Sequence, residues 1–238
     1  MVSRPKARIR LDLAAILDRD SAHRPPYRRL VGELAALLAS RPASPDPDEL
    51  PNGGGRPVLV LPAFLTGDSY TRDLREFLER CGFRASGWGL GINWGPTPKL
   101  LDGVLRRFDA LYRDEGPLAL IGVSLGGLMA RNLAYERPDQ VRHVVTIASP
   151  FRLPTATTLG PLVRLCAPAY SPAIQVDRLL SPLPVPSTMI FTRDDGIVAW
   201  DRCCGDDPNG EAVQLSGAHL TLGSDPRARR AIVRRLAP

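Results

Sequence analysis

Lysine is almost absent from this chain of 238 residues, where Lys6 and Lys99 are the only two, so arginine carries nearly all of the net charge of +6. The arginines are scattered along helical patterns, and aromatic residues, at 6% of the composition, do not alternate with them. A groove for single-stranded nucleic acid combines basic side chains with aromatic platforms. We therefore expect no nucleic-acid partner, and "RARRAIVRRL" near the C-terminus predicts a helix with arginines on its solvated side.

Long apolar runs are also missing. No stretch reaches the roughly 18 uninterrupted apolar residues that a membrane-spanning helix needs, and no small-residue cleavage site follows the basic N-terminus. The 44% hydrophobic content is nevertheless enough for the core of one globular domain. These features predict a soluble, cytoplasmic protein with no integral membrane segment.

The few cysteines show no spacing typical of metal ligands, and reduced thiols are expected of a cytoplasmic protein. A bridge from Cys166 to Cys203 or Cys204 stays open at this point. No metal site is predicted.

Residues 1–56 are predicted to form an N-terminal helical segment and a linker. "YRRLVGELAALL" from Tyr27 has apolar residues at helical spacing, which predicts an amphipathic helix. "SRPASPDPDELPNGGGRP" follows it and lacks any periodicity, which indicates an exposed linker.

Residues 57–238 are predicted to form the core. Continuous apolar runs alternate with helical patterns, which indicates strands buried on both faces and joined by crossover helices. The sequence therefore predicts an α/β protein with a parallel open sheet and helices on both faces. Strands are expected at "PVLVLPAF", "RASGWGLG", "PLALIGVS", "HVVTIASP", "STMIFTRD" and "AVQLSGAH". Between about residues 150 and 186, eight prolines interrupt this rhythm, which predicts short helices in a cap or lid, with an ordinary packed insertion as the alternative.

Gly122 to Gly126 form the motif G-x-S-x-G, with a buried strand before it and a helix after it. The tight turn of this motif leaves no room for side chains two residues before and after the serine, and it exposes the hydroxyl at the sheet edge. Ser124 is therefore the candidate nucleophile. The amide of Leu125 and that of Phe64, in the loop after the first core strand, are candidates for an oxyanion hole.

A serine nucleophile needs a histidine base that is oriented by a carboxylate. His23 precedes the core and His143 begins a predicted strand, at the end opposite the expected site. His219 follows the last predicted strand, so elimination selects it as the base. The acid should follow a strand between Ser124 and His219, and "TMIFTRDDGIVAW" supplies both Asp194 and Asp195.

Four segments in this order resemble the α/β-hydrolase family, in particular a compact group of bacterial esterases and lipases. They are "PAFLTGD", "GWGLG", "GVSLGG" and "DGIVAW". The resemblance implies the α/β-hydrolase fold with about six strands, and ester hydrolysis through an acyl-enzyme with no metal or organic cofactor. The D-G-x-V turn of related hydrolases favours Asp195 as the acid. One departure is Ala63, which stands where the family usually has the glycine that turns the next amide into the oxyanion hole.

The sequence thus predicts a carboxylic ester hydrolase with Ser124, His219 and Asp195 as its triad. Phe64, Leu65, Leu125 and Phe151 are the predicted lining of an apolar acyl pocket, which suits a small-molecule or lipid-like ester. Two alternatives stay open: a thioesterase or amidase with the same triad, and a catalytically silent binding protein on the same fold.

Overall fold

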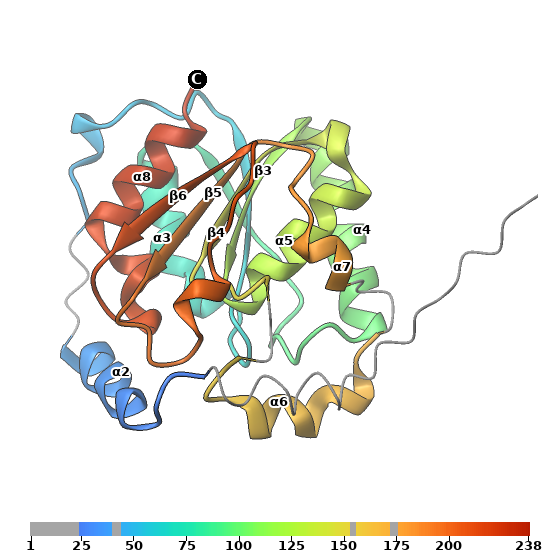
Figure 1. Cartoon of the computed structure of the whole chain (residues 1–238). Helices are drawn as coiled ribbons and strands as arrows, with labels where there is room; N and C mark the ends of the chain where they lie inside the picture. The colour runs from blue at the N-terminus through green and yellow to red at the C-terminus, as the bar shows by residue number, and fades with distance from the viewer. Residues whose placement is uncertain (1–23, 40–43, 153–155, 172–175) are drawn as a thin grey trace, which may run out of the picture.

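The computed structural model describes residues 24–39, 44–152, 156–171 and 176–238. Within this part, six strands form one sheet in the order β2-β1-β3-β4-β5-β6 (Figure 1). Every neighbouring pair is parallel, so the prediction of an open, mostly parallel sheet of about six strands is confirmed. The strands are β1 (Pro57–Leu61), β2 (Arg84–Gly87), β3 (Leu118–Val123), β4 (Val141–Ile147), β5 (Ser187–Thr192) and β6 (Gly210–Leu215).

The continuous apolar runs arise because the central strands are buried on both faces. Along β1, Val58 and Val60 belong to one apolar cluster, and Leu59 and Leu61 belong to another. Side chains alternate between the two faces of a strand, so each face contributes to its own core.

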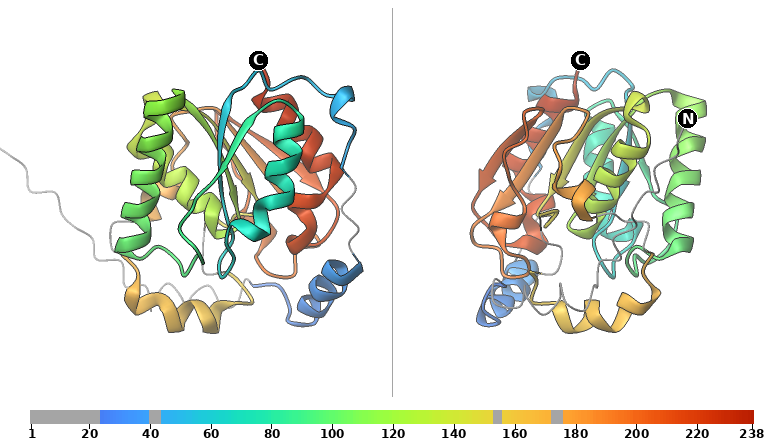
Figure 2. Two further views of the ribbon diagram at one scale, coloured as in Figure 1. Left: turned by 180° about the vertical axis from the view of Figure 1, so that it is seen from behind. Right: turned by 45° about the vertical axis from the view of Figure 1, so that its right-hand side comes forward.

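Helices cover both faces of the sheet, as predicted. The face of Val58 and Val60 packs against α3 (Asp68–Arg80) and α8 (Pro226–Leu236). The opposite face packs against α4 (Pro98–Glu115) and α5 (Leu125–Glu136). Figures 1 and 2 show these two helical layers with the sheet between them.

The strand order reverses beside β1. The chain runs from β1 outward to β2, crosses back to β3 on the other side of β1, and then continues outward to β6. In open parallel sheets, ligands bind at such a switch point, outside the carboxyl ends of the strands. The loops after β1 and β3, which carry Phe64 and Ser124, border this switch point.

Short helices lie between β4 and β5, in the segment for which a lid is predicted. They include α6 (Gly160–Cys166) and α7 (Val176–Leu180). An isolated antiparallel bridge joins Thr157 to Val198, so the start of this segment is attached to the loop after β5. The role of the segment as a lid, and the domain boundary at residue 56, stay predictions. The 3-10 helices of the described chain are η2 (Pro47–Glu49), η3 (Pro138–Gln140), η4 (Ala167–Ala169), η5 (Trp200–Arg202) and η6 (His219–Ser224).

The helix predicted near residue 27 is present as α2 (Arg28–Ala39), but its apolar side faces solvent. Val31 is 72% exposed and Leu38 is 81% exposed, whereas Glu33 is the buried residue of this helix. An amphipathic helix on a globular protein ordinarily turns its apolar side to the core. The reason for the opposite orientation of α2 lies in the contacts of Glu33, described below.

Two further expectations are settled by the described residues. In α8, Arg229 is fully buried rather than solvated, because its guanidinium pairs with Asp73 and lies over the ring of Phe77. All four cysteines are free thiols, so there is no bridge from Cys166. No helix in the described part is both long and apolar enough to cross a bilayer.

Candidate functional site

Ser124 stands at a strained turn between β3 and α5. Its φ is 50° and its ψ is −118°, a left-handed conformation that L-residues adopt only when the surrounding structure imposes it. A Cβ at Gly122 would lie 2.3 Å from the Cα of Gly127, and a Cβ at Gly126 would lie 2.3 Å from the carbonyl oxygen of Leu61. Both positions therefore require glycine, because a side chain at either one would clash with neighbouring backbone atoms, as the motif predicts.

Hydrogen bonds connect the carboxyl ends of four neighbouring strands. The amide of Ser124 donates to the carbonyl of Ile147 at 2.7 Å, so the turn after β3 is bound to the end of β4. The amide of Ala148 donates to Ile190 at 2.8 Å, which binds the end of β4 to β5. The hydroxyl of Thr192 donates to the carbonyl of Gly217 at 2.8 Å, which binds the end of β5 to the loop after β6. These bonds hold the loops of the site along one edge.

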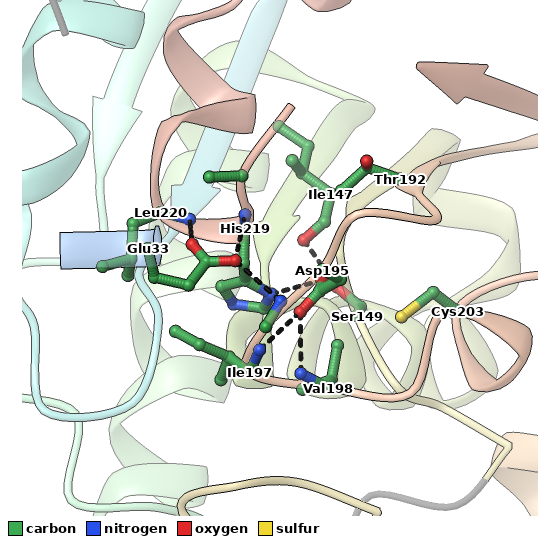
Figure 3. Close-up of polar contacts among 12 residues, drawn as sticks. Glu33, Ile147, Ser149, Thr192, Asp195, Ile197, Val198, Cys203, His219 and Leu220 are labelled. Atoms are coloured by element: carbon green, nitrogen blue, oxygen red, sulfur yellow. Dashed lines mark hydrogen bonds and ion pairs between the residues drawn. The ribbon is translucent and has the colours of Figure 1, made fainter. Parts of the chain in front are cut away.

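Asp195 and His219 form a buried pair at this edge (Figure 3). The Nδ1 atom of His219 lies 2.7 Å from Oδ2 of Asp195, and each residue is 2% exposed. The other oxygen of Asp195 accepts from the amides of Ile197 at 2.8 Å and Val198 at 2.7 Å, which fix the carboxylate. Asp194 instead accepts from the amide of Gly217, so it is Asp195 that contacts the imidazole.

The charges around His219 favour its protonated form. Burial by itself lowers the pKa of His219, but the charge of Asp195, the hydrogen bond to Asp195 and the charge of Glu33 together raise the pKa above its usual value. An imidazole that donates from Nδ1 to a carboxylate leaves Nε2 free to accept a proton. The pair therefore has the electrostatics of a general base.

Glu33 is a site residue that the sequence analysis did not identify. Its carboxylate accepts from the amides of His219 at 2.9 Å and Leu220 at 3.0 Å (Figure 3). It also accepts from the amide of Gly196 at 2.7 Å. The sequence holds one weak signal for it, because Glu33 is the single acidic residue of α2. Its partners are backbone amides about 160 to 190 residues away, which no motif marks.

The loop after β1 is held in place by Asn93, which is fully buried and which the sequence analysis also missed. Asn93 donates from its side chain to the carbonyl of Pro62 at 2.8 Å, and its carbonyl accepts from the amide of Leu65 at 2.8 Å. The left-handed residue of this loop is Leu65, with φ of 59°, and not Ala63. The alanine at position 63 therefore introduces no left-handed strain. Among the described residues, no backbone carbonyl accepts from the amide of Phe64.

The amide of Leu125 begins α5, and the first amides of a helix have no partner within it. Both candidate oxyanion donors, Phe64 and Leu125, thus border the switch point with amides that the regular structure does not use. The side chains of Phe64, Leu65 and Leu125 are half-buried at this edge. Phe151 is buried, with the guanidinium of Arg131 4.1 Å from its ring centre.

The other predicted positions are less closely joined. In the described part, no hydrogen bond connects the Ser124 hydroxyl with the imidazole of His219, and catalytic hydrogen bonds are often long before substrate binds. His143 lies within β4, where its Nε2 is 2.9 Å from the hydroxyl of Thr188. His23 lies outside the described residues. No group of three or more His, Cys, Asp or Glu that suits a metal ion occurs among the residues described.

No family model matches the chain, and no curated protein matches it. Among solved structures, it resembles one of the metagenome-derived lipolytic enzymes LipS and LipT, with a TM-score of 0.57 and 17% identity over 78% of this chain and 96% of the other. It also resembles an α/β superfamily hydrolase from Oenococcus oeni, with a TM-score of 0.56 and 14% identity over 77% and 95%. The thioesterase domain from the curacin biosynthetic pathway has a TM-score of 0.52 and 14% identity over 77% and 92%. The chain therefore has the α/β-hydrolase fold.

Proposed function

We propose that this protein is a serine hydrolase that cleaves carboxylic esters through an acyl-enzyme. The observation that carries the proposal is the contact of 2.7 Å between Asp195 and His219, formed at the same sheet edge as the strained turn of Ser124. A serine, a carboxylate and a histidine that follow three strands in this order are the parts that nucleophilic acyl transfer requires. The lipolytic enzymes and the hydrolase that share the fold support the same reaction class.

In the first half of the reaction, the hydroxyl oxygen of Ser124 attacks the ester carbonyl carbon, and Nε2 of His219 takes the hydroxyl proton. Asp195 stabilises the imidazolium that forms, because its carboxylate already accepts from Nδ1. The oxyanion of the tetrahedral intermediate accepts hydrogen bonds from the amides of Phe64 and Leu125. His219 then returns its proton to the departing alcohol as the carbon–oxygen bond breaks.

In the second half, water attacks the acyl group on Ser124. His219 takes one proton from this water and later returns it to the serine oxygen, so the acid is released and the free enzyme is restored. Each proton that His219 takes is returned within the same cycle. No metal or organic cofactor takes part in these steps.

We infer that the acyl group is apolar. Phe64, Leu65 and Leu125 have half-buried apolar side chains in the segments after β1 and β3, which border the switch point, and Phe151 follows β4. An apolar lining favours an acyl chain over a sugar or a charged peptide. The expected substrate is thus a small-molecule or lipid-like ester.

Ser124→Ala tests the proposal directly. We expect hydrolysis of p-nitrophenyl esters to fall by about 10⁴- to 10⁶-fold, because the nucleophile is lost, and we expect a fluorophosphonate probe to label the wild-type protein only. Ser69→Ala is the matched control, since Ser69 is exposed on α3 and should leave both readouts unchanged. Wild-type hydrolysis by Ser124→Ala would overturn the assignment, and an unlabelled wild-type protein would indicate a silent binding protein.

Cleavage of thioesters is the second candidate, and the likeness to a thioesterase domain favours it over cleavage of amides. The triad is the same, so only the leaving group differs. Hydrolysis rates on an ester, a thioester and an amide that share one acyl group decide between these three activities. A kcat/KM that is highest on the sulfur ester would replace the esterase by a thioesterase.

A further inference from the structure

The Glu33 carboxylate connects the loops that follow two neighbouring strands, β5 and β6. One oxygen accepts from the amides of Gly196 and His219, and the other accepts from the amide of Leu220. Gly196 directly follows Asp195 in the loop after β5, and His219 and Leu220 belong to the loop after β6. One buried side chain of α2 therefore holds the acid loop and the histidine loop together (Figure 3).

The docking of α2 depends on this contact. Glu33 is 2% exposed, whereas Val31, Leu34 and Leu38 of the same helix are mostly exposed. Leu30 packs at the margin of the cluster that contains Phe191, which is little apolar contact for a helix of 12 residues. A helix that was attached only for stability would bury its leucines instead.

The loop after β5 is shaped to receive α2. A Cβ at Gly196 would lie 2.7 Å from the carbonyl oxygen of Arg29 and 2.9 Å from Cγ of Glu33, so a larger residue at position 196 would push the helix away. Arg29 in turn donates to the carbonyl of Arg193 at 3.2 Å. These contacts are independent of the three amide bonds, and they place α2 against the same turn.

We propose that Glu33 is a positioning residue for the acid–base step, which fixes Asp195 and His219 relative to one another from outside the sheet. The proposal rests on the hydrolase function proposed above. Glu33 touches neither reacting atom. It acts through the backbone of the two loops, so its loss should reduce kcat and leave KM nearly unchanged.

The charge of Glu33 gives this role a signature that simple anchoring of a helix would lack. The groups that face His219 are Asp195 from the loop after β5, Glu33 from α2, and Tyr70 from α3, whose hydroxyl donates to the carbonyl of Leu220. Burial and the charge of Glu33 raise the pKa of Tyr70 to about 12, so Tyr70 is neutral near pH 7. Glu33 and Asp195 are thus the two charges that raise the pKa of His219.

Glu33→Gln in the full chain is the test. The glutamine keeps the shape of the side chain, but its amide nitrogen must face at least one of the three N–H donors, which leaves that donor unsatisfied. We expect kcat to fall by about tenfold or more. The acidic limb of the kcat/KM profile should also move to lower pH, because one charge that raises the pKa of His219 is gone.

Glu79→Gln is the matched control, since Glu79 is exposed on α3 and should leave kcat and the pH profile unchanged. Glu33→Asp separates geometry from charge: it keeps the charge but shortens the side chain, so kcat should fall while the acidic limb stays near its wild-type position. It also keeps the test valid if Glu33→Gln does not fold. If the folded Glu33 variants matched Glu79→Gln in kcat and in the acidic limb, the proposal would be wrong.

Titration of the His219 imidazole by NMR gives a second readout that needs no turnover. A lower pKa of His219 in Glu33→Gln than in the wild type supports the contact even if the protein hydrolyses no ester. In that case the hydrolase function fails while the link between Glu33 and His219 stands. An unchanged pKa of His219 in folded Glu33→Gln would overturn the link itself.

Discussion

Two histidines, one half-buried in the sheet and one fully buried beside its edge, have opposite properties. His143 is the third residue of β4, and burial together with the charge of Arg235 lowers its pKa to about 4, against a small opposing effect of Glu211. His219 follows β6, where Asp195 and Glu33 raise its pKa in spite of burial. Burial alone lowers the pKa of both, so the neighbouring charges decide which histidine can accept a proton near pH 7.

The backbone differs between the two ends of the strands in a similar way. Before β1, β2 and β3, left-handed positions are filled by glycines such as Gly54, Gly82 and Gly116. After β3 and β4 they are filled by Ser124 and Ala148, which bear a side chain. Strain of this kind persists where the surrounding structure imposes it, and it is concentrated at functional sites. The strained, charged edge is thus the edge that carries the candidate site.

Replacing each histidine by glutamine should give the largest difference in activity between the two positions. We expect His219→Gln to lower ester hydrolysis by about 10⁴-fold or more, because the base is lost. His143→Gln should leave hydrolysis within about threefold of wild type, because the two positions share no partner. The measurement is kcat/KM on one p-nitrophenyl ester, with thermal unfolding to check that both variants fold. Equal losses in the two variants would contradict the assignment of the base.

The pH dependence sharpens the same comparison. In the proposed mechanism hydrolysis needs neutral His219, so kcat/KM should fall about tenfold per pH unit below a pKa that lies above the usual value of about 6.5. NMR titration should place His143 near 4. An acidic limb well below pH 6 would show that Asp195 and Glu33 do not raise the pKa of His219.

The two histidines should also have opposite effects on stability. The raised pKa of His219 contributes stability that is complete below about pH 6.5 and is lost as the pH rises through its folded-state pKa. The lowered pKa of His143 contributes stability that is present above about pH 6.5 and is lost as the pH falls towards 4. The free energy of unfolding of His143→Gln should therefore depend less on pH between these values than that of the wild type.

The sheet, its helices and the pair of Asp195 and His219 could be predicted because each rests on a pattern in the sequence. Buried parallel strands are apolar throughout, and three histidines are few enough for elimination to select His219. The choice of Asp195 over Asp194 depended on the resemblance of the turn that follows, and the structure joins His219 to Asp195.

Glu33 and Asn93 could not be predicted, because their partners are mostly backbone atoms of distant loops. Backbone amides and carbonyls occur at every position, so a sequence does not mark which of them a side chain will reach. The same reason explains why α2 was predicted as an ordinary amphipathic helix. In α2, the hydrogen bonds of Glu33 outweigh the preference of the helix's leucines for burial.

The smallest expected effects concern the backbone at the two edges. Gly116 ends α4 with φ of 79°, and a Cβ there would meet no atom within 4 Å, so Gly116→Ala tests conformational strain alone. We expect it to lower the free energy of unfolding by about 1 kcal/mol and to leave hydrolysis unchanged.

In Ala148→Gly, relief of left-handed strain is offset by the greater freedom of glycine in the unfolded chain, so stability should change by less than about 1 kcal/mol. Urea unfolding measures both, and a Gly116→Ala protein as stable as the wild type would show that glycine is not what relieves strain at the amino edge.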